Sequence, residues 1–119
     1  MSADHYLGNP NLKKVGTEIN FTQEQIQEYL KCKEDPVYFA MNYIKIISLD
    51  EGIVPFKMWD FQQELIEKFH KHRFNIAKLP RQTGKSTTCV SYLLHYVLFN
   101  DNVNVGILAN KLSTARDLL

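Results

Sequence analysis

The sequence predicts an α/β fold in which a parallel sheet is preceded by helices. Residues 73–79 alternate in polarity and indicate a strand, a helical pattern follows Gly84 through Leu98, and residues 103–108 indicate a second strand. Between them, residues 100–102 have the composition of a turn. A strand, a helix and a strand in this order predict a parallel β-α-β unit. Because a parallel sheet needs cover on both faces and only two strands are visible, we expect the unit to be part of a larger domain.

Three helices are expected before this unit. The spacing of Thr22 and Gln25 fits a capping box, so a helix is expected from there to about Lys33. At Asp35-Pro36 another helix is expected to begin, because aspartate can cap it and proline suits its first position. Apolar faces mark the second and third helices: Val37, Ala40, Met41 and Ile44 in one, Phe61, Leu65, Ile66 and Phe69 in the other.

These patterns divide the chain into three parts. Residues 1–20 contain glycine, proline and asparagine without a sustained period and indicate an extended N-terminal arm. Residues 21–72 form a helical lead-in, and residues 73–119 begin the sheet domain.

Composition narrows the class of protein. The chain has 119 residues, 45% apolar content and a net charge of +1, which fits one small domain or a piece of a larger one and does not by itself imply a nucleic-acid partner. Its apolar runs are too short to cross a bilayer and no signal peptide is evident, so an intracellular location is expected. Cys32 and Cys89 lack the spacing of a zinc site and are expected to be reduced thiols.

A phosphate-binding pattern joins the first predicted strand to the helix after it. Residues 79–86 end in Gly84-Lys85-Ser86, which matches the end of the G-x-x-x-x-G-K-[ST] template, although Leu79 stands where the template has glycine. In such a loop, backbone N–H groups and a helix N-terminus bind phosphate, the lysine neutralises the β and γ oxygens, and the hydroxyl binds Mg²⁺. A basic turn without a ligand is the alternative. We favour a nucleotide site and, with it, a partial P-loop NTPase sheet of the RecA-like type.

Arg81, inside this loop, has two interpretations. Its guanidinium could approach the γ-phosphate and stabilise the charge of the transition state, as an arginine finger supplied by the same chain. Alternatively it is an exposed arginine paired with an acid, which contributes under about 1 kcal/mol and gives no reason for an arginine beside Gln82. We favour the catalytic role.

Gln62 lies about one short helix before the loop. Its amide could present a donor and an acceptor to the edge of adenine. The alternative is a solvated glutamine beside a buried Phe61.

Two other groups of residues have weaker functional interpretations. Residues 44–51 resemble an apolar strand that ends in Asp50-Glu51, but they precede the loop. The helix that begins at Asp35-Pro36 is also expected to run into this stretch, so we interpret the two acids as a helix end or turn and assign them no metal. The basic group of residues 68–73 is typical of a solvated helix end, and contact with DNA is the less favoured alternative.

Taken together, the chain resembles the beginning of the ATPase domain of the large terminase subunit of tailed bacteriophages, a DNA-packaging motor. The resemblance covers nearly the whole chain. By position, Lys85 and Ser86, with Thr87 behind, match the family's phosphate and Mg²⁺ contacts, Arg81 its cis-acting arginine, and Gln62 its adenine-reading glutamine. The matching blocks are residues 9–14, 37–40, 60–62, 79–86 and 106–111.

The sequence departs from the family pattern at two positions. Pro80 stands where relatives often have a small residue, and Lys57 where some have a second glutamine. The segment after Ile107 resembles the family's motif that couples nucleotide state to DNA.

The resemblance implies ATP and Mg²⁺ as cofactors and a defined set of site residues. Arg81 and Lys85 are the expected catalytic residues, and Ser86 is the expected metal ligand. The expected nucleotide contacts are Gln62, Arg81, Gln82, Thr83, Gly84, Lys85, Ser86 and Thr87.

The implied function is ATP hydrolysis that drives double-stranded DNA into a procapsid, with endonuclease activity in full-length relatives. The implied partners are double-stranded DNA, a portal protein, a small terminase subunit and further copies in a ring, without a membrane. The implied location is the host cytoplasm and, transiently, the procapsid portal. Because the Walker B acids would lie beyond Leu119, we expect this chain alone not to hydrolyse ATP. The alternatives are a fragment of a helicase-like DNA-translocating ATPase and a catalytically inactive, truncated binding module.

Overall fold

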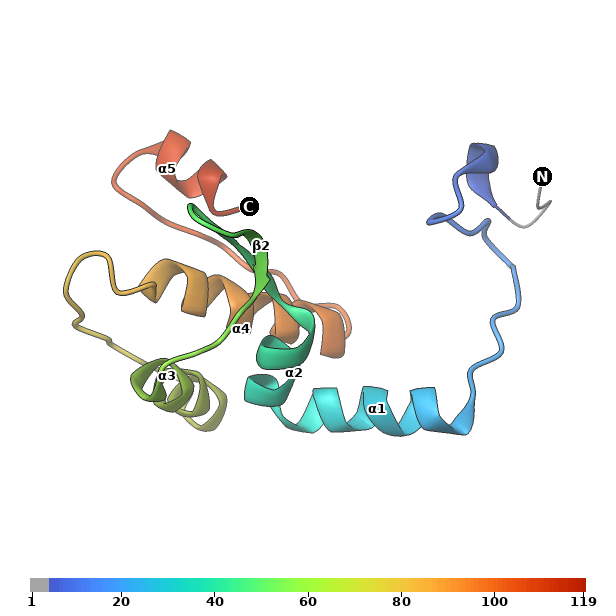
Figure 1. Ribbon diagram of the computed structural model, residues 1–119, viewed down its shortest axis with the longest axis horizontal. Coiled ribbons are helices and arrows are strands. Elements are labelled where there is room, and N and C mark those ends of the chain that lie inside the picture. The colour runs from blue at the N-terminus through green and yellow to red at the C-terminus, as the bar shows by residue number, and fades with distance from the viewer. Residues whose placement is uncertain (1–4) are drawn as a thin grey trace.

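Helices dominate the structure, and a small sheet accompanies them. The computed structural model describes residues 5–119; it is 49% helical and has, within these residues, one two-stranded antiparallel sheet (Figure 1). This confirms the expected α/β class in a broad sense. In chain order the elements are the 3-10 helix η1 (Tyr6–Gly8), α1 (Gln23–Glu34), α2 (Pro36–Tyr43), β1 (Lys45–Ser48), β2 (Gly52–Pro55), α3 (Asp60–Lys71), α4 (Lys85–Phe99) and α5 (Leu112–Asp117).

The starts of α1 and α2 follow from local hydrogen bonds. The Gln25 N–H donates to Thr22 Oγ1 (3.2 Å), and the Thr22 N–H donates to Gln25 Oε1 (3.0 Å), which confirms the capping box. At α2, Asp35 Oδ1 accepts from the backbone N–H groups of residues 37 and 38 (3.0 and 3.1 Å), and proline occupies the first turn. Both helices therefore begin where the sequence predicts.

Residues 44–55 form a hairpin rather than an extension of α2. The expectation that α2 runs into this stretch is wrong, because α2 ends at Tyr43 and β1 pairs with β2 from Lys45↔Pro55 to Ser48↔Gly52. The expected turn is present at residues 49–51. The isoleucines and valine in these strands favour extended backbone, and Gly52 adopts the positive φ of +75° that closes the turn.

The two predicted parallel strands are not present as strands. Residues 73–79 and 103–108 have no regular hydrogen-bonded structure, and Phe74, Ile76 and Leu108 are largely exposed. A lone pair of parallel strands has no stable form without cover on both faces, and the one sheet described among residues 5–119 consists of β1 and β2. The helix between the segments and the turn at residues 100–102 are as predicted.

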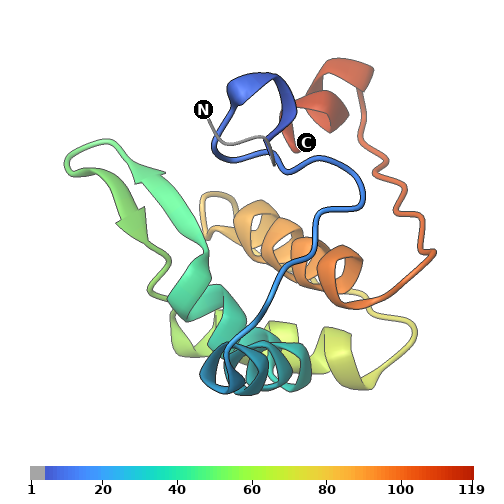
Figure 2. The same cartoon turned by 90° about the vertical axis from the view of Figure 1, so that its right-hand side faces the viewer.

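The core lies where α2, α3 and α4 meet. These helices pack against one another, and α1 packs on α2. Figure 2 shows α4 across α3, with the hairpin projecting to one side, while Figure 1 shows α1 leading away to the N-terminal arm. Residues 1–4 of the predicted arm lie outside the described residues. The buried core consists of Ala40, Phe56, Met58 and Ile66, with Val37, Ile44, Ile46 and Tyr92 packed against it.

The residues of the predicted apolar faces are buried or half-buried with one exception. In α3, Ile66 is fully buried, and Phe61, Leu65 and Phe69 are half-buried. In α2, Met41 is exposed, contrary to expectation. Residues 37, 40 and 44 already occupy the face that packs into the core, and Met41 lies outside it.

A carboxylate with two tyrosines joins α1 to α2. The hydroxyls of Tyr38 and Tyr43 both donate to Glu28 Oε1, at 2.7 and 2.8 Å. These hydrogen bonds lower the pKa of Glu28 and raise the pKa of Tyr43 to about 12. The pair of hydrogen bonds fixes the angle between the two helices next to the core.

A buried histidine joins α4 to α1. His95 is only 3% exposed, and its Nε2 donates to the Cys32 carbonyl at 2.8 Å. Its ring packs against the rings of Phe39 and Phe99, at centroid distances of 5.5 and 4.8 Å. Burial lowers the pKa of His95, and the nearby ring of His70 acts in the same direction. The folded protein therefore favours the neutral imidazole.

We expect the protein to lose stability in mild acid because of His95. Its pKa is lowered from 6.5 in the folded state, so below about pH 6.5 the unfolded chain binds more protons and the free energy of unfolding falls. Urea unfolding followed by circular dichroism at about pH 7.5 and about pH 5.5 measures this difference. In a His95→Phe variant, which keeps an aromatic ring, the difference should shrink. An equal loss in both proteins would contradict the assignment.

Candidate nucleotide site

The loop before α4 is a tight turn held by its own residues. Gln82 and Gly84 have positive φ angles of +59° and +71°, and Thr83 Oγ1 donates to the Pro80 carbonyl at 2.9 Å. Gly84 is the residue before the helix, and α4 follows at Lys85. The loop therefore turns the chain directly into the N-terminus of a 15-residue helix.

The N-terminus of α4 is open toward this loop. No side chain caps the helix, whose first backbone bond runs from the Thr88 N–H to the Gly84 carbonyl (3.0 Å). The N–H groups of residues 85–87 have no hydrogen-bond partner within the helix and point out of its N-terminus. This is the end of a helix that carries a positive partial charge. An anion at this position would gain both hydrogen bonds and the field of the helix.

Two cations stand at this helix end without acids. Arg81 and Lys85 are exposed, and the one ion pair among residues 5–119 joins Lys68 to Glu64, at 2.7 Å. Arg81 therefore forms no ion pair with an acid in this part of the chain, in contrast to the alternative interpretation. Ser86 and Thr87, the predicted hydroxyl ligands, are exposed on the first turn of α4. The predicted loop residues thus lie together.

Gln62 also reaches the loop, but it faces protein groups. Its side chain is 6% exposed; Oε1 accepts from the Trp59 N–H at 2.9 Å, and Nε2 donates to the Thr83 carbonyl at 3.3 Å. The absence of a side chain at Gly84 allows this arrangement, because a Cβ there would lie 2.7 Å from Gln62 Nε2. The amide therefore connects the start of α3 to the loop.

Two cavities flank the loop. One of about 410 Å³ lies between the loop, α3 and β1, and Trp59, Phe61 and Gln62 form part of its wall. The other, of about 280 Å³, lies between the loop, α3 and α4, with Lys85, Ser86 and Leu79 among its lining residues. Neither lining includes an aspartate or glutamate. The complete lining of the first cavity is Ile46, Phe56, Lys57, Trp59, Phe61, Gln62, Gln82, Thr83, Gly84 and Thr87.

Trp59 is the site residue that sequence reasoning did not identify. It is the single tryptophan of the chain, 73% exposed, and its ring stands 6.2 Å from that of Phe61 at an interplanar angle of 79°. The sequence does contain a signal for Trp59. It directly precedes a predicted helix and Gln62 follows three residues later, a spacing that places both residues at the same end of the helix.

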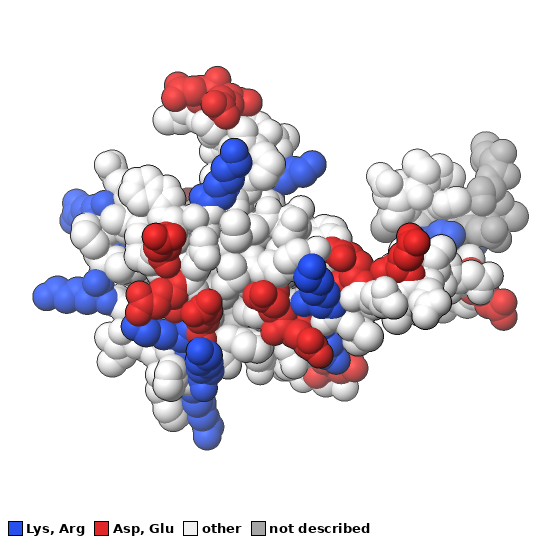
Figure 3. All heavy atoms as spheres, turned by 60° about the horizontal axis from the view of Figure 1, so that its bottom comes forward, with Lys and Arg blue, Asp and Glu red and all other residues white. Residues whose placement is uncertain are grey.

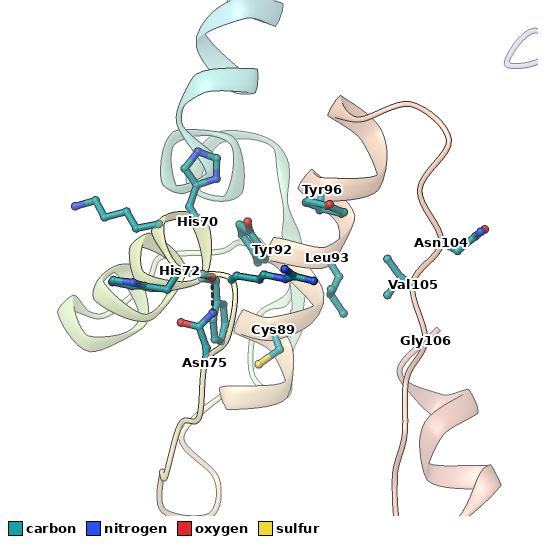
Figure 4. A pocket seen from close by; sticks show the side chains of 13 residues that line it. His70, His72, Asn75, Cys89, Tyr92, Leu93, Tyr96, Asn104, Val105 and Gly106 are labelled. Carbon is teal, nitrogen blue, oxygen red and sulfur yellow. Dashed lines mark hydrogen bonds between the residues drawn. The ribbon is translucent and has the colours of Figure 1, made fainter.

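A cavity larger than these two lies elsewhere. It has a volume of about 650 Å³ between the end of α3, α4 and residues 104–106, and contains none of the loop residues 79–87 (Figure 4). Figure 4 shows His70, His72, Tyr92 and Tyr96 around it. We place the candidate site at the loop, because an uncapped helix N-terminus, hydroxyls and two cations without an ion pair among residues 5–119 lie together there.

The basic group at the end of α3 is part of an ordinary charged surface. Lys68 pairs with Glu64 on the same helix, and the guanidinium of Arg73 lies 5.1 Å from the ring centre of Phe74. On the face drawn in Figure 3, acidic and basic side chains are interspersed. Nothing in this arrangement favours DNA over the solvated helix end.

The described part of the chain offers few other reactive groups. Asp50 and Glu51 lie in the hairpin turn, and residues 5–119 contain no group of three His, Cys, Asp or Glu side chains that could bind a metal. Cys32 and Cys89 are free thiols, and burial raises the pKa of both. None of the helices described here is long and apolar enough to cross a membrane.

We expect a Gly84→Ala substitution to destabilise the protein by about 1–3 kcal/mol. Alanine at a φ of +71° is strained, and its Cβ would displace the Gln62 amide from its two hydrogen bonds. Gly106→Ala is the matched control, since a Cβ there meets nothing within 4 Å and its φ is not positive. Urea unfolding measures the stability of the two variants. Equal losses of stability would show that the backbone conformation at Gly84 does not cause the effect.

Chemically, the site provides free N–H groups, a lysine, an arginine and hydroxyls next to an aromatic cavity. This combination suits a phosphorylated ligand with a planar ring. In a comparison with protein-family models, no model matches this chain.

Proposed function

We propose that this chain is the ATP-binding part of a viral DNA-packaging motor of the large-terminase type. The observation that carries the nucleotide part of this proposal is the open N-terminus of α4. Gly84 precedes it, and Lys85 in its first turn has no ion pair within the part of the chain that the structure describes. The motor class rests on the resemblance of the sequence blocks around this loop, above all Arg81 inside it.

Each residue has a task in the proposed site. The N–H groups of residues 85–87 and the Lys85 ammonium bind the β- and γ-phosphates. Ser86, with Thr87 behind it, holds Mg²⁺, which neutralises phosphate charge when bound. Arg81 approaches the γ-phosphate and stabilises charge in the transition state. The nucleobase occupies the aromatic cavity beside Gln62, and Gln82 and Thr83 complete the loop.

The proposed fold in the complete motor is a parallel P-loop sheet of the RecA-like type. In it, residues 73–79 and 103–108 pair as neighbouring strands, which places the loop at the carboxyl end of the first strand. Their exposed apolar side chains, at Phe74, Ile76 and Leu108, would then be covered by further structure.

We expect this chain to bind ATP without turning it over. Hydrolysis in this class needs a carboxylate that holds Mg²⁺ and a group that orients water, and no acid lines either cavity beside the loop. In the complete motor, hydrolysis would move double-stranded DNA into a procapsid at the portal protein, within the host cytoplasm. The small terminase subunit and further copies in a ring would be partners, and an endonuclease would cut the DNA.

Two alternatives differ in class. A fragment of a helicase-like translocating ATPase would also carry a glutamine before a Gly-Lys-Ser loop, but Arg81-Gln82 favours the packaging motor. A non-enzymatic binding module would bind nucleotide without ever hydrolysing it.

Titration of the purified 119-residue protein with ATP, with and without Mg²⁺, tests the proposal. We expect saturable binding that Mg²⁺ strengthens, at concentrations below about 1 mM. Lys85→Ala should weaken this binding by roughly tenfold to a hundredfold. A phosphate-release assay in parallel should give no rate above that of Lys85→Ala. Absence of binding would overturn the nucleotide site, and a Lys85-dependent rate would overturn the claim that the chain alone is inactive.

A further inference from the structure

We infer that the nucleobase is held by stacking on Trp59 and not by hydrogen bonds to Gln62, so that the site accepts purine and pyrimidine triphosphates alike. This inference rests on the proposed nucleotide site and specifies how that site treats the base.

The Gln62 amide is committed to the protein. Its oxygen accepts from the Trp59 N–H at 2.9 Å, and its nitrogen donates to the Thr83 carbonyl at 3.3 Å. The side chain is 6% exposed, and the nitrogen lies against the Cα of Gly84. To present a donor and an acceptor to a base edge, Gln62 would have to give up both bonds and leave the loop. Its task in this geometry is to position the loop.

Trp59, unlike Gln62, is exposed to solvent and open to a ligand. Its side chain lies in the wall of the 410 Å³ cavity and is 73% exposed, and the edge-to-face contact with Phe61 holds its ring in place. An exposed aromatic ring fixed beside a phosphate-binding loop is suited to stack on a base.

No other side chain of this cavity imposes a donor and acceptor pattern. Phe56, Ile46 and Phe61 are apolar, and the Thr83 hydroxyl already donates to the Pro80 carbonyl. The remaining polar side chains, Lys57, Gln82 and Thr87, are exposed to solvent and not buried against a base. Strong discrimination between bases needs buried polar groups that one base satisfies and another leaves unpaired. Every base has a π-face, so stacking tolerates all of them.

The single tryptophan makes the inference directly measurable. Mg²⁺ complexes of ATP, GTP, CTP and inorganic tripolyphosphate are titrated into the full chain, with binding followed by calorimetry and by Trp59 fluorescence. We expect the three nucleotides to bind within about threefold of one another and to quench the fluorescence. Tripolyphosphate should bind without quenching.

Variants separate stacking from edge recognition. Trp59→Ala should weaken all three nucleotides by roughly fivefold to a hundredfold and leave tripolyphosphate unchanged, and Trp59→Phe should restore much of the affinity. Phe74→Ala, an exposed aromatic outside the cavity, is the matched control. Gln62→Ala should weaken tripolyphosphate and every nucleotide by the same factor, because it acts through the loop.

The outcomes distinguish this inference from the proposed function. If ATP binds more than about tenfold tighter than GTP and Gln62→Ala removes that preference while tripolyphosphate still binds, then Gln62 reads the base and the inference is wrong, but the phosphate site stands. If neither tripolyphosphate nor any nucleotide binds, or if Lys85→Ala has no effect, both fail.

Discussion

Replacing Lys85 by alanine is expected to weaken ATP binding by roughly tenfold to a hundredfold. Lys85 lies in the first turn of α4, exposed and without an acidic partner among residues 5–119, so its ammonium can bind phosphate without breaking an ion pair there. A charge-assisted hydrogen bond to phosphate contributes about 1.5–3 kcal/mol, and each 1.4 kcal/mol corresponds to a tenfold change in affinity. Calorimetric titration with Mg²⁺-ATP measures the loss.

Lys78→Ala is the matched control for this prediction. Lys78 is also exposed and lies in the segment that leads to the loop, but it lines neither of the two cavities beside the loop. Its removal changes the net charge by the same amount, so any general electrostatic effect appears in both variants. Similar losses in both would show that ATP is attracted by overall charge and not bound at the helix end.

Features set by a few neighbouring residues could be predicted from the sequence. The capping box at Thr22 and the Asp35-Pro36 start of α2 depend on side chains that bond to backbone groups two or three residues away. The loop residues 81–87 also follow one another directly, so their convergence at the start of α4 is a consequence of chain continuity. The structure confirms the two helix starts, and it places the loop residues side by side as chain neighbours.

Features that depend on distant partners could not be predicted in the same way. The run at residues 44–51 is compatible with a helix or a strand, and only its pairing with residues 52–55 decides for the hairpin. Residues 73–79 have a strand-like pattern but lack a partner strand and cover. The partners of Gln62, at Trp59 and Thr83, depend on how α3 packs against the loop, which composition does not reveal.

The same packing explains why a substitution outside the loop should affect the site. Gln62 and Ile66 are four residues apart on α3 and are both buried, so they lie on one face of the helix. Ile66 holds that face in the core with Ala40 and Met58, and Gln62 holds the loop at its end. The position of the loop therefore depends on how tightly α3 is packed.

We expect Ile66→Ala to lower the free energy of unfolding by about 2–5 kcal/mol. Ile66 is fully buried in the core, so its truncation removes apolar contacts and leaves a cavity between α3, α2 and Tyr92. The total free energy of unfolding of a natural domain is only about 5–15 kcal/mol. In a chain of this size, the Ile66→Ala variant should therefore be partly unfolded. Urea unfolding followed by far-ultraviolet circular dichroism measures the change.

Ile53→Ala on the hairpin removes the same atoms from a side chain that is 72% exposed, and should change the free energy of unfolding by less than about 0.5 kcal/mol. The two isoleucines differ in burial and not in chemistry, so their difference isolates the contribution of the core. Because α3 also positions Gln62 beneath the loop, Ile66→Ala should weaken ATP binding as well, whereas Ile53→Ala should not. A core variant that loses stability but binds ATP with unchanged affinity would show that the loop holds its shape independently of α3.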